Sequence, residues 1–130
     1  MGKIRVLIAD DNARLRNAIV RILHDTFDIV AAVSSGRELV DAAVSLRPDV
    51  IVSDLEMPEL SGLAAMRILR DKGHQIPFVL LTAMMLGATE WLGMGVLAVV
   101  NKSDMHAELV TAVQSAAAGH VFLSRTALKS

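Results

Sequence analysis

Short apolar runs and amphipathic segments alternate along the whole chain. The apolar runs, each typical of a buried strand, cover residues 4–9, 28–33, 50–53, 78–81 and 96–100. Between these runs, apolar residues recur three and four positions apart, which is the spacing of a helix with one buried face. Nearly continuous apolar strands indicate a sheet covered on both faces, as in parallel sheets joined by helices. The pattern predicts an α/β fold with a doubly wound, five-stranded parallel sheet in the order 2-1-3-4-5.

Residues that favour helix ends stand at the borders of the amphipathic segments. Ser35, with Glu38 three residues later, forms a capping-box pattern at the start of the second helix. Ser61 is expected to cap the third helix and Ser103 the last one, which Gly119 should end. These signals place helices after the second, third and fifth predicted strands, whereas the fourth helix is expected to be less regular.

Charged residues follow three of the apolar runs directly or closely. Asp10 and Asp11 follow the first run, Asp54 the third and Lys102 the fifth. Open α/β sheets bind ligands at the carboxyl ends of their strands, so three carboxylates and an ammonium are expected in one crevice. Carboxylates that lie close together repel one another unless a cation joins them. The spacing therefore predicts a site for a metal of the Mg²⁺ class.

The composition excludes several classes of protein. The 130 residues suffice for one domain, and 53% of them are hydrophobic, as in a packed globular protein. A net charge of −1 gives no electrostatic footprint for nucleic acid, and the lack of cysteine excludes disulfides and thiolate zinc sites. No signal peptide or spanning apolar run is found, so we expect a cytoplasmic protein without a membrane partner. Arg14, Arg16 and Arg21 are expected to form a solvated stripe on the first helix.

Four sequence elements occur in a fixed order, each beginning at the carboxyl end of an expected strand: Asp10-Asp11, Asp54-Leu55-Glu56-Met57-Pro58 with Gly62 beyond it, Leu80-Leu81-Thr82-Ala83, and Lys102. Together they resemble the receiver domain of two-component response regulators, over nearly the whole chain. The stretch 45–58 is similar in particular to the NarL/FixJ/LuxR-type branch. The resemblance implies a flavodoxin-like receiver domain at residues 1–124, with a tail or the start of a linker at 125–130.

The resemblance also implies a role for each acidic residue. Asp54 would accept a phosphoryl group from a phosphohistidine on a sensor histidine kinase or a phosphotransfer protein. Asp11 would bind Mg²⁺ directly and Asp10 mainly through water. Asp54 itself and the backbone carbonyl of Glu56 would complete the protein's share of the metal site, whereas the Glu56 side chain is expected to be solvated. Mg²⁺ often keeps several waters and uses one or two carboxylates plus phosphate, which suits so sparse a site.

Lys102 and Thr82 would bind the phosphoryl oxygens and switch the protein, again by resemblance. Lys102 would pair first with Asp54 and then with the phosphoryl group, and Thr82 would draw its loop inward. A receiver of this kind is not an enzyme for a separate substrate, because it catalyses only its own phosphorylation and dephosphorylation. Phosphorylation adds about 1.5–2 negative charges at one point, which is enough to reorder a bistable loop.

Three features depart from the family pattern. Val99 stands three residues before Lys102, where an aromatic residue is usual, and Ser103 stands where proline is usual. A cis bond before a non-proline residue costs about 2.5–4 kcal/mol, which favours trans at this bond but leaves the isomer open. The stretch between Thr82 and Lys102 is about two residues short, and segment 84–94 has few periodic positions, so its helix should be short. We expect intact phosphorylation chemistry with altered signal propagation.

Residues 119–124 resemble the segment that leads from such receivers toward a helix-turn-helix domain. We therefore expect a receiver taken from a transcription factor, which would contact DNA only through an output domain outside this chain. A homodimer through the first and fifth helices is a further expectation from the resemblance.

An α/β domain with acidic residues at its strand ends could have three other functions. A Mg²⁺-dependent phosphohydrolase with Asp10 as nucleophile would need an Asp-x-Asp motif, which Asp10-Asp11-Asn12 does not supply. A nucleotide- or flavin-binding module would need a glycine-rich first turn, where Asn12-Ala13-Arg14 stands instead. A pseudo-receiver that is not phosphorylated and acts only as a protein-interaction module stays open.

Overall fold

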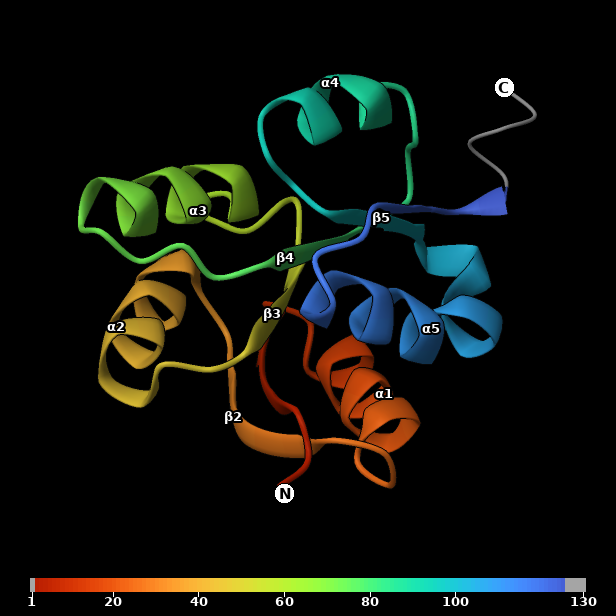
Figure 1. The fold of residues 1–130 in the computed structure, drawn as a ribbon, viewed down its shortest axis with the longest axis horizontal. Coiled ribbons are helices and arrows are strands. Elements are labelled where there is room, and N and C mark those ends of the chain that lie inside the picture. Colours follow the sequence, from red (N-terminus) through yellow and green to blue (C-terminus); the bar gives the residue numbers. More distant parts are fainter. Residues whose placement is uncertain (1, 126–130) are drawn as a thin grey trace.

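The computed structural model describes residues 2–125, which form a parallel sheet between two layers of helices (Figure 1). Its strands are β1 (Arg5–Ala9), β2 (Asp28–Val33), β3 (Val50–Asp54), β4 (Phe78–Thr82), β5 (Ala98–Asn101) and β6 (Phe122–Leu123). All neighbouring strands are parallel, and their spatial order is β2-β1-β3-β4-β5-β6. The predicted fold class and the order 2-1-3-4-5 are confirmed. The predicted number of five strands was too low, because the short β6 adds to the β5 edge.

The helices cover both faces of this sheet. They are α1 (Ala13–Leu23), α2 (Gly36–Leu46), α3 (Gly62–Asp71), α4 (Ala88–Gly93) and α5 (Met105–Ala117), with a 3₁₀ turn, η1, at Lys102–Asp104. Figure 1 shows α1 and α5 on one face and α2, α3 and α4 on the other. None of the helices in residues 2–125 has the length and apolar character needed to span a bilayer.

The residues of β1 show how the sheet joins two cores. Val6 and Ile8 are fully buried among residues of α1 and α5, whereas Leu7 and Ala9 are fully buried among residues of α2 and α3. Successive side chains of a strand point to opposite faces, so an all-apolar strand is required wherever both faces are covered. Burial on both faces explains why the strands appear in the sequence as continuous apolar runs.

Side-chain caps start the first three helices. The Oδ1 atom of Asn12 accepts a hydrogen bond from the backbone of Leu15 (3.1 Å). Ser35 caps α2, as predicted, by accepting from the backbone N–H of Glu38 (3.1 Å), but the Glu38 carboxylate accepts from the backbone N–H of Ser34 (3.0 Å), one residue before the cap. Ser61 caps α3 by accepting from the backbone N–H of Ala64 (3.1 Å). These caps fix the point at which the chain turns from the sheet edge into each helix.

The predicted cap of the last helix was wrong. Ser103 lies inside η1, and α5 begins after Asp104 without a side-chain cap bond. Asn101 caps η1 instead, because its Oδ1 accepts from the backbone N–H of Ser103 at 3.0 Å. Asparagine at the end of a strand can supply this local bond as well as serine can, so the sequence alone did not distinguish the two. The helix does end before Gly119, whose φ of +80° is favourable for glycine.

The fourth helix is short, as predicted. It has six residues, and its N-cap Gly87 makes no side-chain cap bond. From α3, Arg70 donates to the backbone carbonyls of Met94 (2.6 Å) and Gly95 (2.8 Å) just after the helix. Gly95 has a φ of +103°, and a Cβ there would lie 2.4 Å from the guanidinium nitrogens of Arg70. A charge-assisted clamp from α3 therefore fixes the end of this helix, which its own sequence defines only weakly.

Candidate functional site

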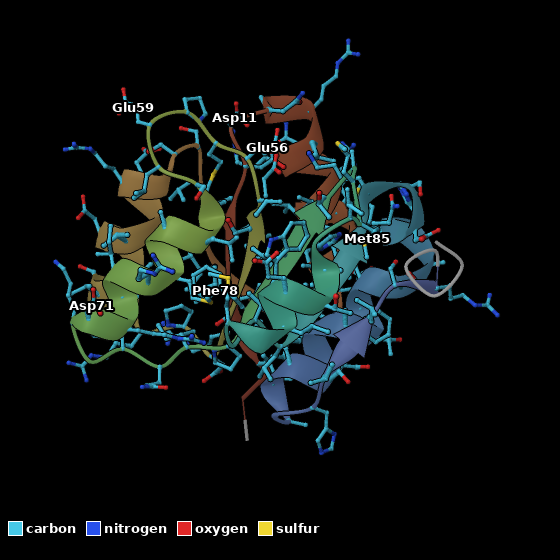
Figure 2. The ribbon with its side chains drawn as sticks, turned by 90° about the horizontal axis from the view of Figure 1, so that it is seen from above. Asp11, Glu56, Glu59, Asp71, Phe78 and Met85 are labelled. Atoms are coloured by element: carbon cyan, nitrogen blue, oxygen red, sulfur yellow. The ribbon has the colours of Figure 1, made fainter. Side chains whose placement is uncertain are left out.

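The strand register brings the predicted site residues to one edge of the sheet. Ala9 pairs with Ser53, so the residues that follow them, Asp10 and Asp54, are neighbours. Thr82 pairs with Asn101, the residue before Lys102. In Figure 2, Asp11 and Glu56 lie toward one end of the molecule and Asp71 toward the other. The predicted convergence is therefore present in the structure.

Three aspartates form a tight cluster at this edge. One carboxylate oxygen from each of Asp10, Asp11 and Asp54 lies within 4.8 Å of the others. Asp10 is fully buried and Asp54 is 5% exposed, whereas Asp11 is exposed. Like charges at this separation repel strongly where water is excluded, so the cluster is suited to a bound cation.

The surroundings of Asp10 show the same demand for a cation. Its Oδ1 atom accepts a hydrogen bond from the backbone of Asn12 (2.9 Å), but its Oδ2 atom is buried without a hydrogen-bond partner among the described residues. Burial raises the pKa of Asp10, and the charge of Asp54 raises it further, while the Asn12 N–H opposes both effects. A buried carboxylate oxygen without a donor is costly unless a cation approaches it. The residues present therefore fit a hard cation such as Mg²⁺.

Lys102 pairs directly with Asp54. The distance from Lys102 Nζ to Asp54 Oδ2 is 3.0 Å, and the other carboxylate oxygen, Oδ1, accepts from the backbone N–H of Glu56 (3.1 Å). Every peptide bond within residues 2–125 is trans, including Lys102-Ser103, which settles the isomer that the sequence left open. The approach of the lysine thus does not depend on proline at position 103.

Thr82 faces the same site but bonds to its own loop. Its hydroxyl donates to the backbone carbonyl of Met84 (3.0 Å) and accepts from the Met84 N–H (3.1 Å). A small cleft of about 100 Å³ is lined by Asp54, Glu56, Thr82, Ala83, Met84 and Lys102. Within this cleft Asp54 and Lys102 are in contact, whereas the Thr82 hydroxyl is hydrogen-bonded to the backbone of Met84.

The family model described as "Response regulator receiver domain" matches residues 6–114. The chain belongs to this family. A relative from Archaeoglobus fulgidus, named protein-glutamate methylesterase/protein-glutamine glutaminase, is 35% identical over 127 residues, which cover 88% of this chain and 36% of the relative. A nitrate/nitrite response regulator protein homolog from Haemophilus influenzae is 42% identical over 82 residues, or 62% of this chain and 39% of that protein.

A solved structure of a two-component response regulator of the LuxR family from Aurantimonas sp. has a TM-score of 0.90. It is 24% identical and covers 98% of this chain and 94% of its own, so it shows the shared receiver fold. The sequence relatives include both a methylesterase and a nitrate/nitrite regulator, and this receiver spans well under half of either. Membership of the receiver family is thus shown. The NarL/FixJ/LuxR-type branch is one of several branches among the proteins that this chain resembles.

Val99 stands at the position where the sequence comparison with the receiver family leads us to expect an aromatic residue. It is fully buried in the core on the side of α2, α3 and α4. That signal propagation is altered by the lack of an aromatic residue here stays a prediction.

Arg16 is a site residue that the sequence interpretation missed. The predicted solvated stripe is wrong for this residue, because Arg16 is only partly exposed and its Nη1 atom donates to the backbone carbonyl of Asp10 at 2.8 Å. Arg16 lies six residues after Asp10, across the turn between β1 and α1. This separation is not a helical spacing, so no sequence pattern indicates the bond. Arg16 therefore holds the turn that carries Asp10 and Asp11.

Replacing Arg16 by glutamine is expected to lower the free energy of unfolding by about 1–2 kcal/mol, because a charge-assisted hydrogen bond to the partly buried Asp10 carbonyl is lost. Urea unfolding at matched salt measures the effect. Arg14→Gln removes the same charge from an exposed position of the same helix and should change stability by less than about 0.5 kcal/mol. Equal effects of the two substitutions would show that only charge, and not the bond to Asp10, matters.

Proposed function

We propose that this receiver accepts a phosphoryl group on Asp54 in a Mg²⁺-dependent reaction, with a phosphohistidine of a sensor kinase or phosphotransfer protein as the donor. The observation that carries the proposal is the cluster of three carboxylates within 4.8 Å, with the Lys102 ammonium 3.0 Å from Asp54. Family membership supports the same function. Phosphoryl transfer requires positioning and charge neutralisation more than covalent assistance, and this site offers both.

Asp54 is the proposed acceptor because it alone of the three aspartates lines the cleft. One of its oxygens would form the new bond to phosphorus while the bond between phosphorus and the donor's histidine nitrogen breaks. The Glu56 N–H and Lys102 hold the carboxylate in place before the reaction. As charge builds up on the phosphoryl oxygens, the Lys102 ammonium would move onto them, and the Thr82 hydroxyl would leave Met84 to bind them.

Asp11 and Asp54 would hold Mg²⁺ directly, Asp10 would act mainly through water, and the Glu56 backbone carbonyl would complete the protein ligands. When bound, the ion would neutralise the carboxylates and part of the phosphoryl charge. Support for the ion comes from the buried Asp10 Oδ2 atom, which finds no donor among the described residues. The Glu56 carboxylate does not belong to the cluster of Asp10, Asp11 and Asp54, so its backbone carbonyl is the better candidate.

Acetyl phosphate provides the direct test. With Mg²⁺ present, the protein should gain the mass of one phosphoryl group, and the gain should be labile to base and to hydroxylamine, as expected of an acyl phosphate. Chelation of the metal should prevent labelling, because the carboxylate cluster then repels the incoming phosphate. Intact-mass spectrometry measures both effects. No labile mass gain in the presence of Mg²⁺ would favour the pseudo-receiver, the second candidate that Val99 supports.

The wider context belongs to the same proposal. We assign the receiver to residues 1–124 and to the NarL/FixJ/LuxR-type branch, with a transcriptional output through a DNA-binding domain outside this chain. The nitrate/nitrite relative and the LuxR-family fold support this branch. A homodimer through α1 and α5 and a cytoplasmic location complete it. All of the predicted tail at 125–130 except Arg125 lies outside the described residues.

A further inference from the structure

Ser124, directly after β6, is fully buried at the edge of the sheet. Its backbone N–H donates to the carbonyl of Val99 (2.9 Å), and its Oγ atom accepts from the backbone N–H of Asn101 (3.1 Å). One residue therefore bonds to β5 at two points, and the second is the last residue of that strand. Ser124 extends the contact between the two strands up to Asn101, the residue before Lys102.

Ser124 also joins the edge of the sheet to α5. Its hydroxyl is hydrogen-bonded to Glu108, which is only 8% exposed, and lies 3.1 Å from Asp104 Oδ2. The backbone N–H of Arg125 donates to the other Glu108 oxygen (3.3 Å). If the Ser124 oxygen were removed, the Asn101 N–H and the Glu108 carboxylate would both lose a partner in buried surroundings, which is costly. Ser124 is thus held firmly, and it holds its partners firmly in return.

The bond to Asn101 leads directly to the lysine of the site. The Oδ1 atom of Asn101 accepts from the N–H and the hydroxyl of Ser103 (3.0 and 2.9 Å), which closes the turn around Lys102. Lys102 then reaches Asp54 at 3.0 Å. Position 103 lacks proline, and in this chain the hydrogen bonds of Asn101 and Ser124 hold the turn instead.

We propose that Ser124 is a positioning residue for Lys102, so that docking of β6 and binding of a phosphoryl group at Asp54 stabilise each other. The inference rests on the proposed function and extends it to the C-terminal strand. Coupling between two binding events is reciprocal: if the docked strand favours the lysine position that binds the phosphoryl group, the phosphoryl group favours the docked strand. Binding of a phosphoryl group at Asp54 would then stabilise the docked β6, although position 99 holds a valine and not an aromatic residue.

The first test measures the affinity of the folded protein for beryllofluoride, a phosphoryl mimic, in the presence of Mg²⁺. Ser124→Ala should weaken binding about 3–10-fold, the change that corresponds to about one net hydrogen bond. Ser115→Ala removes a hydroxyl from a partly buried position of α5 and should change the affinity less than about twofold, because within residues 2–125 no hydrogen bond of its side chain leads to the turn around Lys102. Folded Ser124→Ala protein with wild-type affinity would overturn the proposal.

A second measurement uses the wild-type protein alone and does not require the variant to fold. Amide hydrogen exchange followed by NMR should slow at Asn101 and Ser124 when Mg²⁺ and beryllofluoride bind, by about the same 3–10-fold. Ligand binding stabilises the whole folded protein and slows every amide that exchanges through global unfolding, so a merely structural role would slow these two amides no more than the amides of β1. Slowing at both amides no greater than in β1 would overturn the coupling even if Ser124→Ala does not fold.

The two proposals can fail separately. If wild-type protein does not bind beryllofluoride, or if Asp54→Asn binds it equally well, the proposed function fails and the inference fails with it. If binding depends on Asp54 but not on Ser124, and the exchange of Asn101 is unchanged, only the positioning role fails.

Discussion

Asp54→Asn is expected to abolish labelling by acetyl phosphate and Mg²⁺, with a loss of about two orders of magnitude or more, to the background level. The amide oxygen is a poor nucleophile, whereas the shape of the side chain and its acceptor oxygen for the Glu56 N–H are kept. The substitution relieves the repulsion among three crowded negative charges but gives up the ion pair with Lys102 (3.0 Å), so its two effects on the free energy of unfolding oppose each other. Intact-mass spectrometry measures labelling, and urea unfolding checks that the variant folds.

A matched control separates the loss of the acceptor from the loss of a charge. Asp71→Asn removes the same charge from an exposed residue at the far end of α3, away from the site (Figure 2), and should label like the wild type. Labelling that persists in Asp54→Asn but is lost in Asp10→Asn would identify Asp10 as the nucleophile. The phosphohydrolase hypothesis would then replace the receiver proposal.

Much of the fold could be predicted because the sheet is buried on both faces. Continuous apolar runs located the first five strands, and the ranges agree within two residues at each end. The strand β6 could not be predicted, because a two-residue strand has no period and its partner residues lie 24 positions earlier in the chain. Pairing of this kind depends on the tertiary structure, which supplies the open edge of β5.

The site was predictable to the extent that it depends on topology. Carboxyl ends of parallel strands meet at one edge, so Asp10, Asp54 and Lys102 had to converge once the strand order was known. The direction of the Thr82 hydroxyl could not be predicted, because rotation about one bond decides between its loop and the cleft. The bond from Arg16 to a backbone carbonyl was missed for a related reason, since it leaves no pattern in the sequence.

Ser124 and Glu108 show a further limit of the sequence. A serine near the end of a chain and a glutamate on an amphipathic helix are usually exposed, and only the packing of β6 against α5 buries them together. A buried polar pair that bonds to the strand before Lys102 becomes visible only in three dimensions. The positioning of Lys102 by Ser124 therefore could not be predicted from the receiver motif in the sequence.

Asp10→Asn is expected to stabilise the metal-free protein while it weakens Mg²⁺ binding. Near pH 7 in the presence of a chelator, Tm should rise by about 3–5 °C, which corresponds to about 1 kcal/mol in a domain of this size. The reason is that the uncharged amide no longer repels Asp54 and Asp11. Its NH₂ group can also donate a hydrogen bond at the position where Asp10 Oδ2 has no hydrogen-bond partner among the described residues. Calorimetry of both proteins with and without Mg²⁺ measures the two effects. Asp41→Asn, at an exposed position of α2, should change neither.

The pH dependence of this stabilisation follows from the raised pKa of Asp10. Between the ordinary value of 3.8 and the raised value, the folded protein holds a proton that the unfolded chain has lost, so wild-type stability falls as the pH rises. The amide introduced by Asp10→Asn cannot ionise, so the advantage of the variant should grow as the pH rises through the folded pKa and shrink toward about pH 4. With Mg²⁺ the wild type should become the more stable of the two proteins. The ion stabilises the protein that binds it more tightly, and the variant has lost one of the carboxylates. A variant that is less stable than the wild type without metal, at every pH, would contradict the repulsion among the three aspartates on which the Mg²⁺ assignment depends.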